Sequence, residues 1–323
     1  MQWVAALAEP PRVWGLPEEH AMSTRTHATP ARRRIARTRD TLGRAALLTA
    51  SIALAAGCTD SGAPGPSGTT PEPSGTTTAP TATATTGEPL WVTAYFMVDT
   101  RAGLRLAREK QDMLDDSVQT AVEMMIAGPL DTDYTTAWNP QTEVLAVSEE
   151  AGLITIDLSQ DARTANIGSE GAALMIQQLV YTATEAAGDP TAGVKLLIEG
   201  APAGELWGAV TWDGPIARAD PMDVRVLVQI DSPAENQVFT SPTVTISGEA
   251  AAFEANVPWT VHDASGAEVA SGFTMTSEGQ TFAPFSFDVD LPPGEYVVEI
   301  SEDDPSGGAG GTPMTDTRTF WIH

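Results

Sequence analysis

Residues 153–158 read Leu-Ile-Thr-Ile-Asp-Leu, and this apolar run predicts a strand on which the fold of the surrounding region depends. The preceding Glu149-Glu150-Ala151-Gly152 predicts a turn, and residues 144–147 supply a partner strand. After the run, apolar residues recur at helical spacing between positions 169 and 187, where Gly188-Asp189-Pro190 ends the pattern. Residues 194–198 then predict another strand. The segment therefore reads as two strands, a helix and a strand.

The same alternation of strands and helices is found upstream. Residues 91–98 and 104–108 predict strands, separated by a turn at 99–103. Ser117 is placed to cap a helix, and Gly128-Pro129 is a typical helix stop. The order β-β-α-β-β-α-β predicts an α+β domain over residues 89–213, with the helices on one face of a sheet.

Five short motifs of this domain follow one another in a characteristic order. They are Tyr95-Phe96, Ala127-Gly128-Pro129, Ile156-Asp157-Leu158-Ser159, Gln177-Gln178-Leu179-Val180-Tyr181-Thr182 and Ile198-Glu199-Gly200. Together they resemble the sporulation and spore germination domain, GerMN. The resemblance implies a domain without enzymatic activity.

Beyond a linker at 214–222, which contains Asp-Gly-Pro and Asp-Pro turn signals, the pattern changes to strands alone. About seven short strands between residues 223 and 323 predict an all-β immunoglobulin-like sandwich. The run Phe253-Glu254-Ala255-Asn256 and the turn Pro293-Gly294 resemble the immunoglobulin-like domain of bacterial spore germination. We expect the two domains to fold independently.

The N-terminal region carries the features of a secretory signal. A cationic block at 32–44 precedes an uncharged apolar run at 45–56, which is too short to span a membrane. The run ends in Ala55-Ala56-Gly57-Cys58, which resembles the lipobox of bacterial lipoproteins. The resemblance implies cleavage after Gly57 and acylation of Cys58, so we expect a lipid-anchored protein on the outer face of the cell membrane. Met22 is an alternative start of this signal.

Residues 58–88 continue from that cysteine as a tether rich in Pro, Thr, Gly and Ser, without large apolar residues, and we expect the tether to be disordered. After removal of residues 1–57, 39 acidic and 9 basic residues remain of the 43 and 17 in the chain, a formal charge of −30. Such a charge disfavours binding to nucleic acid. Cys58 is the only cysteine, and only His262 and His323 follow it, so we expect no catalytic triad, metal site or cofactor.

Several residues nevertheless allow functional readings. The pairs Asp115-Asp116, Glu149-Glu150 and Asp303-Asp304 invite comparison with glycosidase carboxylates, but neighbouring strand residues point to opposite faces. Residues 301–307 contain oxygen ligands suited to calcium without EF-hand spacing. Trp207 and Trp212 could stack on sugar rings or pack at the hinge.

Phe253, Glu254 and Asn256 form a candidate binding edge, since Glu254 and Asn256 read as polar residues within a strand. A structural hydrogen-bonding role is the alternative reading of these two residues. We therefore expect a non-catalytic cell-surface lipoprotein whose two domains bind envelope proteins or peptidoglycan. The alternative is a carbohydrate-active, peptidoglycan-processing enzyme, or its accessory module, that uses acidic residues.

Overall fold

The computed structural model describes residues 89–165, 167–304, 309 and 311–323. The predicted signal region, the lipobox residues Ala55, Ala56 and Gly57, the lipidation site Cys58 and the tether lie outside the described residues. Among the described helices, none is both long and apolar enough to cross a bilayer.

The first domain has the predicted order of elements. Strands β1 (Leu90–Thr100) and β2 (Gly103–Met113) precede helix α1 (Val118–Ala127); β3 (Val144–Glu150) and β4 (Leu153–Leu158) precede α2 (Ser169–Ala186) and β5 (Gly193–Ile198). Ser117 caps α1, since its hydroxyl accepts a hydrogen bond from the Thr120 N–H at 3.2 Å. The predicted α+β class is confirmed, although β2 extends five residues beyond the predicted end at residue 108.

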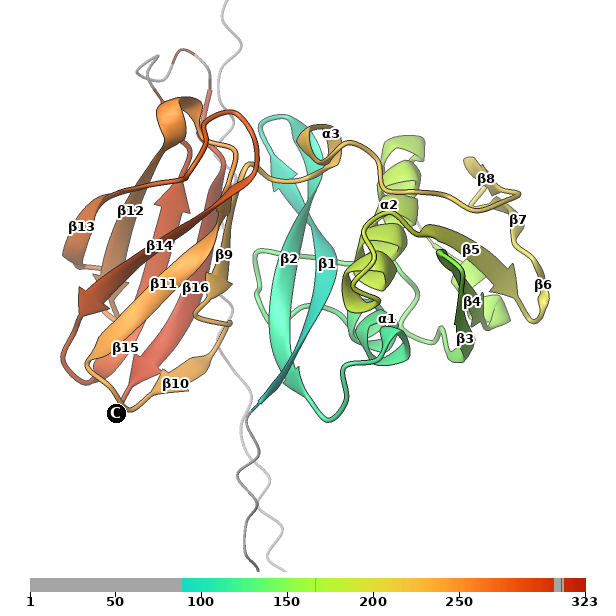
Figure 1. Ribbon diagram of the computed structural model, residues 1–323, viewed down its shortest axis with the longest axis horizontal. Helices are drawn as coiled ribbons and strands as arrows, with labels where there is room; N and C mark the ends of the chain where they lie inside the picture. Colours follow the sequence, from blue (N-terminus) through green and yellow to red (C-terminus); the bar gives the residue numbers. More distant parts are fainter. Residues whose placement is uncertain (1–88, 166, 305–308, 310) are drawn as a thin grey trace, which may run out of the picture. The chain divides into compact units, whose positions relative to one another are not determined.

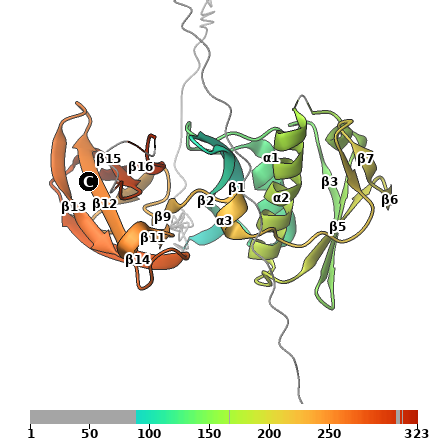
Figure 2. The same cartoon turned by 90° about the horizontal axis from the view of Figure 1, so that it is seen from above.

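The layering differs from the prediction of helices on one face of a single sheet. β1 and β2 form a separate two-stranded ribbon, whereas β3, β4, β5 and the short β6 (Ala201–Pro202) form a second sheet. Helices α1 and α2 lie between the ribbon and the second sheet (Figures 1 and 2). This arrangement explains why 12 of the 18 residues of α2 are buried, because a helix covered on two sides has little solvent-exposed surface.

Contacts from α2 to the free edge of β1 fix this arrangement. The Gln178 amide donates to the Tyr95 carbonyl at 2.9 Å, and the Thr182 hydroxyl accepts from the Tyr95 N–H at 3.0 Å. Residues four apart lie on one face of a helix, so these two side chains reach the same strand residue. They satisfy backbone groups that a further strand would otherwise pair with.

Residues 201–226 return across α2. The segment contains β7 (Gly204–Leu206), β8 (Val210–Trp212) and the four-residue helix α3 (Pro221–Val224). Within the predicted linker 214–222, Ile216 exchanges two backbone hydrogen bonds of 2.8 Å with Val194 of β5. The Tyr181 hydroxyl donates to the Ala219 carbonyl at 2.7 Å. These residues are therefore bound to the first domain, while the independence of the two domains stays a prediction.

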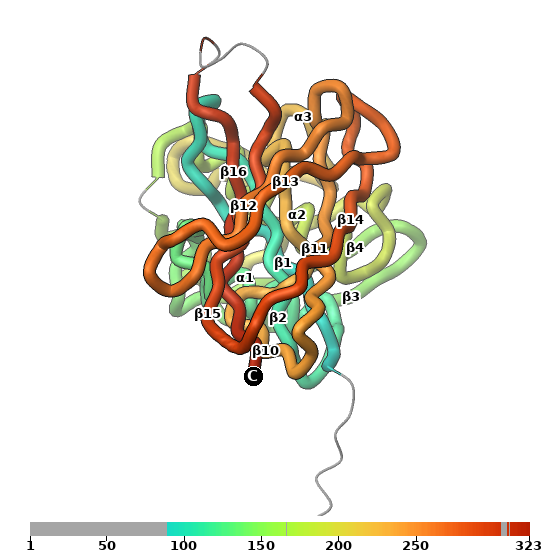
Figure 3. Tube along the Cα trace, turned by 90° about the vertical axis from the view of Figure 1, so that its left-hand side faces the viewer, coloured from blue at the N-terminus to red at the C-terminus, as the bar shows by residue number. Residues whose placement is uncertain are grey.

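The second domain is an all-β sandwich, as predicted. One sheet has the order β10-β16-β15-β12-β13 and the other β14-β11-β9. In Figure 3 the strands of this domain face the viewer. The bounds of its strands are β9 Val228–Ser232, β10 Gln237–Phe239, β11 Thr243–Ala250, β12 Asn256–Asp263, β13 Glu268–Met275, β14 Ala283–Asp290, β15 Gly294–Ser301 and β16 Thr315–Ile322. The first strand starts at Val228, because Val226 is buried in the core of the first domain.

Candidate functional site

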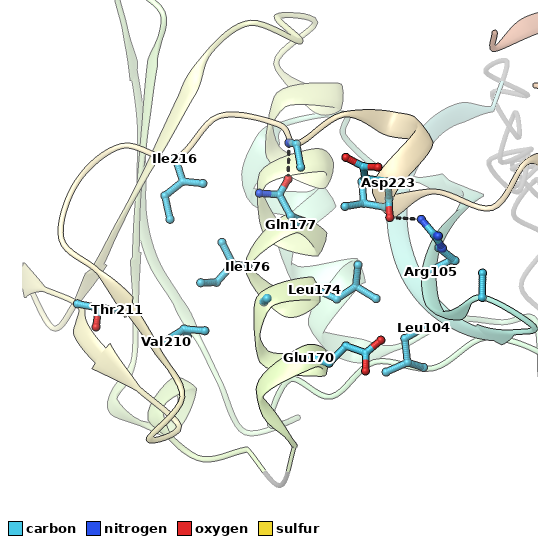
Figure 4. Close-up of a pocket in the computed structure, with 14 residues that line it drawn as sticks. Leu104, Arg105, Glu170, Leu174, Ile176, Gln177, Val210, Thr211, Ile216 and Asp223 are labelled. Carbon is cyan, nitrogen blue, oxygen red and sulfur yellow. Dashed lines mark hydrogen bonds between the residues drawn. The ribbon is translucent and has the colours of Figure 1, made fainter. Parts of the chain in front are cut away.

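A groove of about 650 Å³ runs along α2 in the first domain (Figure 4). Ala173, Leu174 and Ile176 of α2 line it between Leu104 of the β1–β2 ribbon and Ile216 of the returning segment. We call this feature the α2 groove. Its other lining residues are Ala102, Arg105, Glu170, Gln177, Val210, Thr211, Ala219, Asp223 and Val224.

The positions of these residues on α2 and on the returning segment explain why their side chains meet. Residues 173, 174, 176 and 177 occupy neighbouring positions on the surface of α2, beside the face on which Gln178 and Thr182 contact β1. The Gln177 side chain holds the returning segment in place, since its carbonyl oxygen accepts from the Ala219 N–H at 2.8 Å. The groove is therefore a fixed feature of how residues 210–224 pass over α2.

Charged groups lie at the rim of the α2 groove. Arg105 donates from Nη1 to the Asp223 carbonyl and, at 3.3 Å, to the Met222 carbonyl, whereas its Nε is buried without a hydrogen-bond partner among the described residues. Glu170 is exposed in the first turn of α2. Its carboxylate lies against the turn at Gly103, where a Cβ atom would be 2.9 Å from Oε1. The groove thus combines an apolar lining with one guanidinium, that of Arg105, and two carboxylates, those of Glu170 and Asp223.

The predicted binding edge in the second domain has a different local structure. Glu254 lies in a short 3-10 turn, Phe253–Ala255, with a φ of 53°, and not within a strand. Asn256 is the first residue of β12, and its amide donates to Asp303 at 3.0 Å. Phe253 is 45% exposed. The strand interpretation of Glu254 was wrong, because the run from Phe253 to Asn256, which alternates in polarity, also fits a tight turn between strands. A binding role for Phe253, Glu254 and Asn256 stays a prediction.

The other residues considered from the sequence have packing or turn contacts. Trp212 is buried in the core of the first domain and donates from Nε1 to the Val194 carbonyl at 3.3 Å, so of its two predicted roles it has a packing role and is not available to stack on a sugar ring. Trp207 packs edge-on against Trp138, with ring centroids 5.5 Å apart. Asp115 accepts hydrogen bonds from Ser117 and Thr120 at the start of α1. Within the described residues, no cluster of His, Cys, Asp and Glu has the geometry of a metal site.

A buried charge cluster joins the first domain to the second and was not predicted from the sequence. Arg318 of β16 is 1% exposed and donates to Asp131 at 2.7 Å, to Asp316 at 3.0 Å and to the Tyr134 hydroxyl at 2.9 Å. It also donates to the Arg108 carbonyl at 3.0 Å. We call Arg318, Asp131, Asp316 and Tyr134 the Arg318 cluster. Three of the acceptors, Asp131, Tyr134 and the Arg108 carbonyl, belong to the first domain.

The acidic residues near Arg318 have raised pKa values. Burial raises the pKa of Asp131 to about 7, although Arg318 acts in the opposite direction. Burial also raises the pKa of Asp316 and of the neighbouring Glu235. Beside the cluster, Arg108 forms a bidentate pair with Asp231 at 2.7 and 2.5 Å. Because every polar contact of the cluster is within the protein, its evident role is to connect the domains.

Both folded regions match known families. Residues 93–204 match the family described as sporulation and spore germination, and residues 227–309 match the immunoglobulin-like domain of bacterial spore germination. No curated protein has a matching sequence.

Solved structures that are similar to the chain include GerMN domains and a lipoprotein. The tandem GerMN domains of the sporulation protein GerM from Bacillus subtilis are 18% identical, with a TM-score of 0.34, over 41% of this chain and 46% of theirs. The first GerMN domain of that protein is 19% identical, with a TM-score of 0.33, over 40% and 99%. A putative lipoprotein from Clostridium perfringens is 15% identical, with a TM-score of 0.30, over 43% and 93%. This chain therefore spans less than half of the tandem-domain structure.

Proposed function

We propose that this chain is a non-catalytic lipoprotein that binds other envelope components. Its residues 93–204 and 227–309 belong to the GerMN and immunoglobulin-like families of spore germination, and the proposal proceeds from these two matches. The α2 groove is the binding site of the first domain. The observation that carries this proposal is a groove of about 650 Å³ in which apolar side chains surround a few polar groups. Small-ligand and peptide-anchor sites typically have this size and composition.

The occupant of the α2 groove is an apolar segment of an envelope protein. Leu104, Leu174 and Ile216 offer apolar contact along the groove, and burial of such surface favours association. Arg105 adds a positive charge and Glu170 and Asp223 add negative charges at the rim, which orient a peptide that carries polar groups beside its apolar residues. None of the groove's features requires a reaction.

A blocking variant tests the groove. Ala173 is exposed on α2 and lines the groove, so Ala173→Phe fills the space without replacing a core side chain. Glu123→Phe adds the same ring to the exposed surface of α1 and is the matched control. A photoreactive residue in place of Thr211, in the full chain in its own cells, would be crosslinked to the partner and identified by mass spectrometry. We expect Ala173→Phe to abolish this crosslink and Glu123→Phe to retain it; loss in both or in neither would contradict the proposal.

The non-catalytic part of the proposal is tested on peptidoglycan. The full chain, purified in a nonionic detergent, is incubated with peptidoglycan while sedimentation and release of soluble sugar are followed. We expect no sugar release. Release that disappears when one acidic residue is replaced, at Glu149 or Asp303 for example, would favour the alternative of a carbohydrate-active enzyme.

We further propose that Cys58 carries the lipid that holds the protein at the outer face of the membrane. A tether of about 30 residues would let the folded domains reach roughly 30 Å from this anchor. Cys58→Ser should remove the acylation site and leave a protein that no longer enters the detergent phase in detergent partitioning. If Cys58→Ser partitioned like the unaltered chain, the anchor would lie elsewhere.

A further inference from the structure

Strand β13 of the second domain carries exposed apolar side chains on one face. Phe273 is 70% exposed and Met275 is 56% exposed. In the register with β12, Phe273 lies opposite Pro258 and Met275 lies opposite Asn256. A hollow of about 390 Å³ adjoins Phe273 on this face, lined among others by Thr260, Ser271 and Glu299. We call Pro258, Phe273 and Met275 the β13 strip.

The core of the sandwich does not require the β13 strip. On the inner face of the same strands, Trp259 stacks on Phe287 with ring centroids 4.5 Å apart. Gly272 lies opposite Trp259, and a Cβ there would be 2.7 Å from the indole ring, so the glycine leaves room for that ring. Phe273 and Met275 point to the other face, because successive strand residues alternate. Their apolar surface has no packing role within the described residues.

Strand β13 is also an edge strand. It is the last strand of its sheet, and among the described strands it pairs with β12 alone. Edge strands usually carry lysine, proline or inward-pointing charges that discourage pairing, whereas the exposed face of β13 presents phenylalanine and methionine. A free edge beside an apolar strip is the arrangement that accepts an added strand.

The negative charge of the second domain determines which kind of partner can bind the β13 strip. Residues 227–323 contain 15 acidic residues and one basic residue, Arg318, which is buried. Acidic groups surround the β13 strip: Glu299 lies opposite Thr260 on the neighbouring strand, Glu268 lies opposite His262, and Asp303 accepts from Asn256 beside Met275. This surface attracts a cation and repels both an anionic bilayer and a second copy of the domain.

We propose that the β13 strip docks an extended peptide segment of a partner protein in which two apolar residues, two positions apart, are flanked on the same strand face by lysine or arginine. Apolar side chains two residues apart contact Phe273 and Met275, and basic side chains face Glu268, Glu299 and Asp303. The same-face spacing of a strand, about 7 Å, fits side chains at positions 273 and 275. This site is separate from the α2 groove.

The probe that tests the proposal is a rhodamine-labelled decapeptide with valine at positions 5 and 7, lysine at positions 1, 3 and 9 and serine elsewhere, so that its valine and lysine side chains share one strand face. Its binding to the full chain in nonionic detergent is followed by fluorescence anisotropy, with detergent alone as the blank. We expect Phe273→Ser combined with Met275→Ser to weaken binding about tenfold or more, because apolar contacts of two side chains are lost. Val238→Ser is the matched control, since Val238 is 52% exposed on β10, the opposite edge strand of the same sheet. It should change the affinity less than about twofold.

Peptide variants separate charge from apolar contact. Decapeptides in which glutamate replaces each lysine, or serine replaces each valine, should each bind at least about tenfold more weakly than the lysine–valine peptide. Glu268→Gln with Glu299→Gln should weaken binding and make it less sensitive to salt. Equal binding by the Phe273→Ser, Met275→Ser chain, or equal binding of the glutamate–valine peptide, would overturn the proposal.

Two other occupants of the β13 strip, an anionic membrane and a second copy of the chain, are tested by separate measurements. Flotation of the full chain with anionic vesicles that required Phe273 would identify a membrane contact and overturn the proposal. A dimer in sedimentation equilibrium that became monomeric with Phe273→Ser would assign the strip to self-association and would overturn it equally. We expect neither the vesicle-bound form nor the dimer to depend on Phe273.

Discussion

At Arg318 the chain buries a full positive charge between two carboxylates. Asp131 comes from the first domain and Asp316 from the second, and the Tyr134 hydroxyl donates a hydrogen bond to Asp316. Removing one partner from such a group leaves unpaired charges in a medium that solvates them poorly. The contribution of Arg318 to stability therefore depends on its partners more than on its own side-chain volume.

Arg318→Met should lower the free energy of unfolding by about 3–5 kcal/mol, because both carboxylates lose their cation. Arg163→Met is the control, since Arg163 makes a single hydrogen bond of 3.2 Å to the Glu205 carbonyl at the surface. That change should stay within about 0.5 kcal/mol. Urea unfolding followed by tryptophan fluorescence measures both values. Equal losses in the two variants would show that the buried position of Arg318 has no special importance.

The raised pKa of Asp131 predicts how stability depends on pH. In the folded state its pKa is about 7, above the ordinary value of 3.8, so between these values the folded chain binds a proton that the unfolded chain has released. The free energy of unfolding should therefore fall as pH rises from about 4 to 7. The raised pKa values of Asp316 and Glu235 act in the same direction.

Three surface aspartates determine where the free energy of unfolding falls at low pH. Hydrogen bonds lower the pKa values of Asp115, Asp189 and Asp263, so their stabilising effect is lost as pH falls below about 4. Unfolding measured between pH 3 and 8 should show a maximum at mildly acidic pH. Asp131→Asn should flatten the decline above pH 5, and an unchanged slope in this variant would contradict the assignment to Asp131.

Strands β9 and β11 meet at a glycine that no other residue can replace. The register between them shifts at Ser247 and Gly248. A Cβ on Gly248 would lie 1.9 Å from the Gln229 carbonyl oxygen, a backbone atom that cannot move without breaking the pairing. The irregular pairing therefore requires a residue without a side chain.

Gly248→Ala should lower the free energy of unfolding by about 3 kcal/mol or more, since the clash is with backbone. Gly214→Ala is the control, because nothing lies within 4 Å of its ideal Cβ. That variant should be unchanged or stabilised by up to about 1 kcal/mol. Circular dichroism during urea unfolding measures the pair. Tolerance of alanine at 248 would mean that the β9–β11 pairing is looser than described.

Local patterns were sufficient to predict most elements and insufficient to predict their layers. Apolar spacing identified α2, and the Gly128-Pro129 stop identified the end of α1. The same spacing does not reveal that α2 is covered on two sides, because Gln178 and Thr182 read as polar surface residues until β1 is seen to bind them. The α2 groove was missed for a related reason: residues 214–222 read as a linker, and only their contacts with Gln177 and Tyr181 bring them over the helix.

The distribution of charge concerns the whole molecule. Sequence composition predicted a strongly acidic surface, yet the few basic residues are used mainly inside it: Arg108 binds Asp231, Arg225 binds Glu249, and Arg318 is fully enclosed. Pairing across 200 residues of chain cannot be inferred from local pattern, because any of the 43 acids is a candidate partner. The arginines that join the two domains are therefore visible only in the structure.

The two domains should fold separately and then associate through these arginines. Because residues 214–226 are bound to the first domain, the informative fragments are 89–226 and 227–323. Each should melt cooperatively in circular dichroism, at a lower temperature than the full chain, since separation exposes the Arg318 cluster.

When the two fragments are mixed, they should bind each other in isothermal titration calorimetry. Arg318→Met should weaken this binding at least about tenfold while changing the melting of fragment 227–323 little, because Asp131, Tyr134 and the Arg108 carbonyl belong to the other fragment. Val238→Ser in the same fragment should leave binding unchanged. If neither fragment folded, the domains would not be independent units; if both folded without binding, the Arg318 cluster would not hold them together.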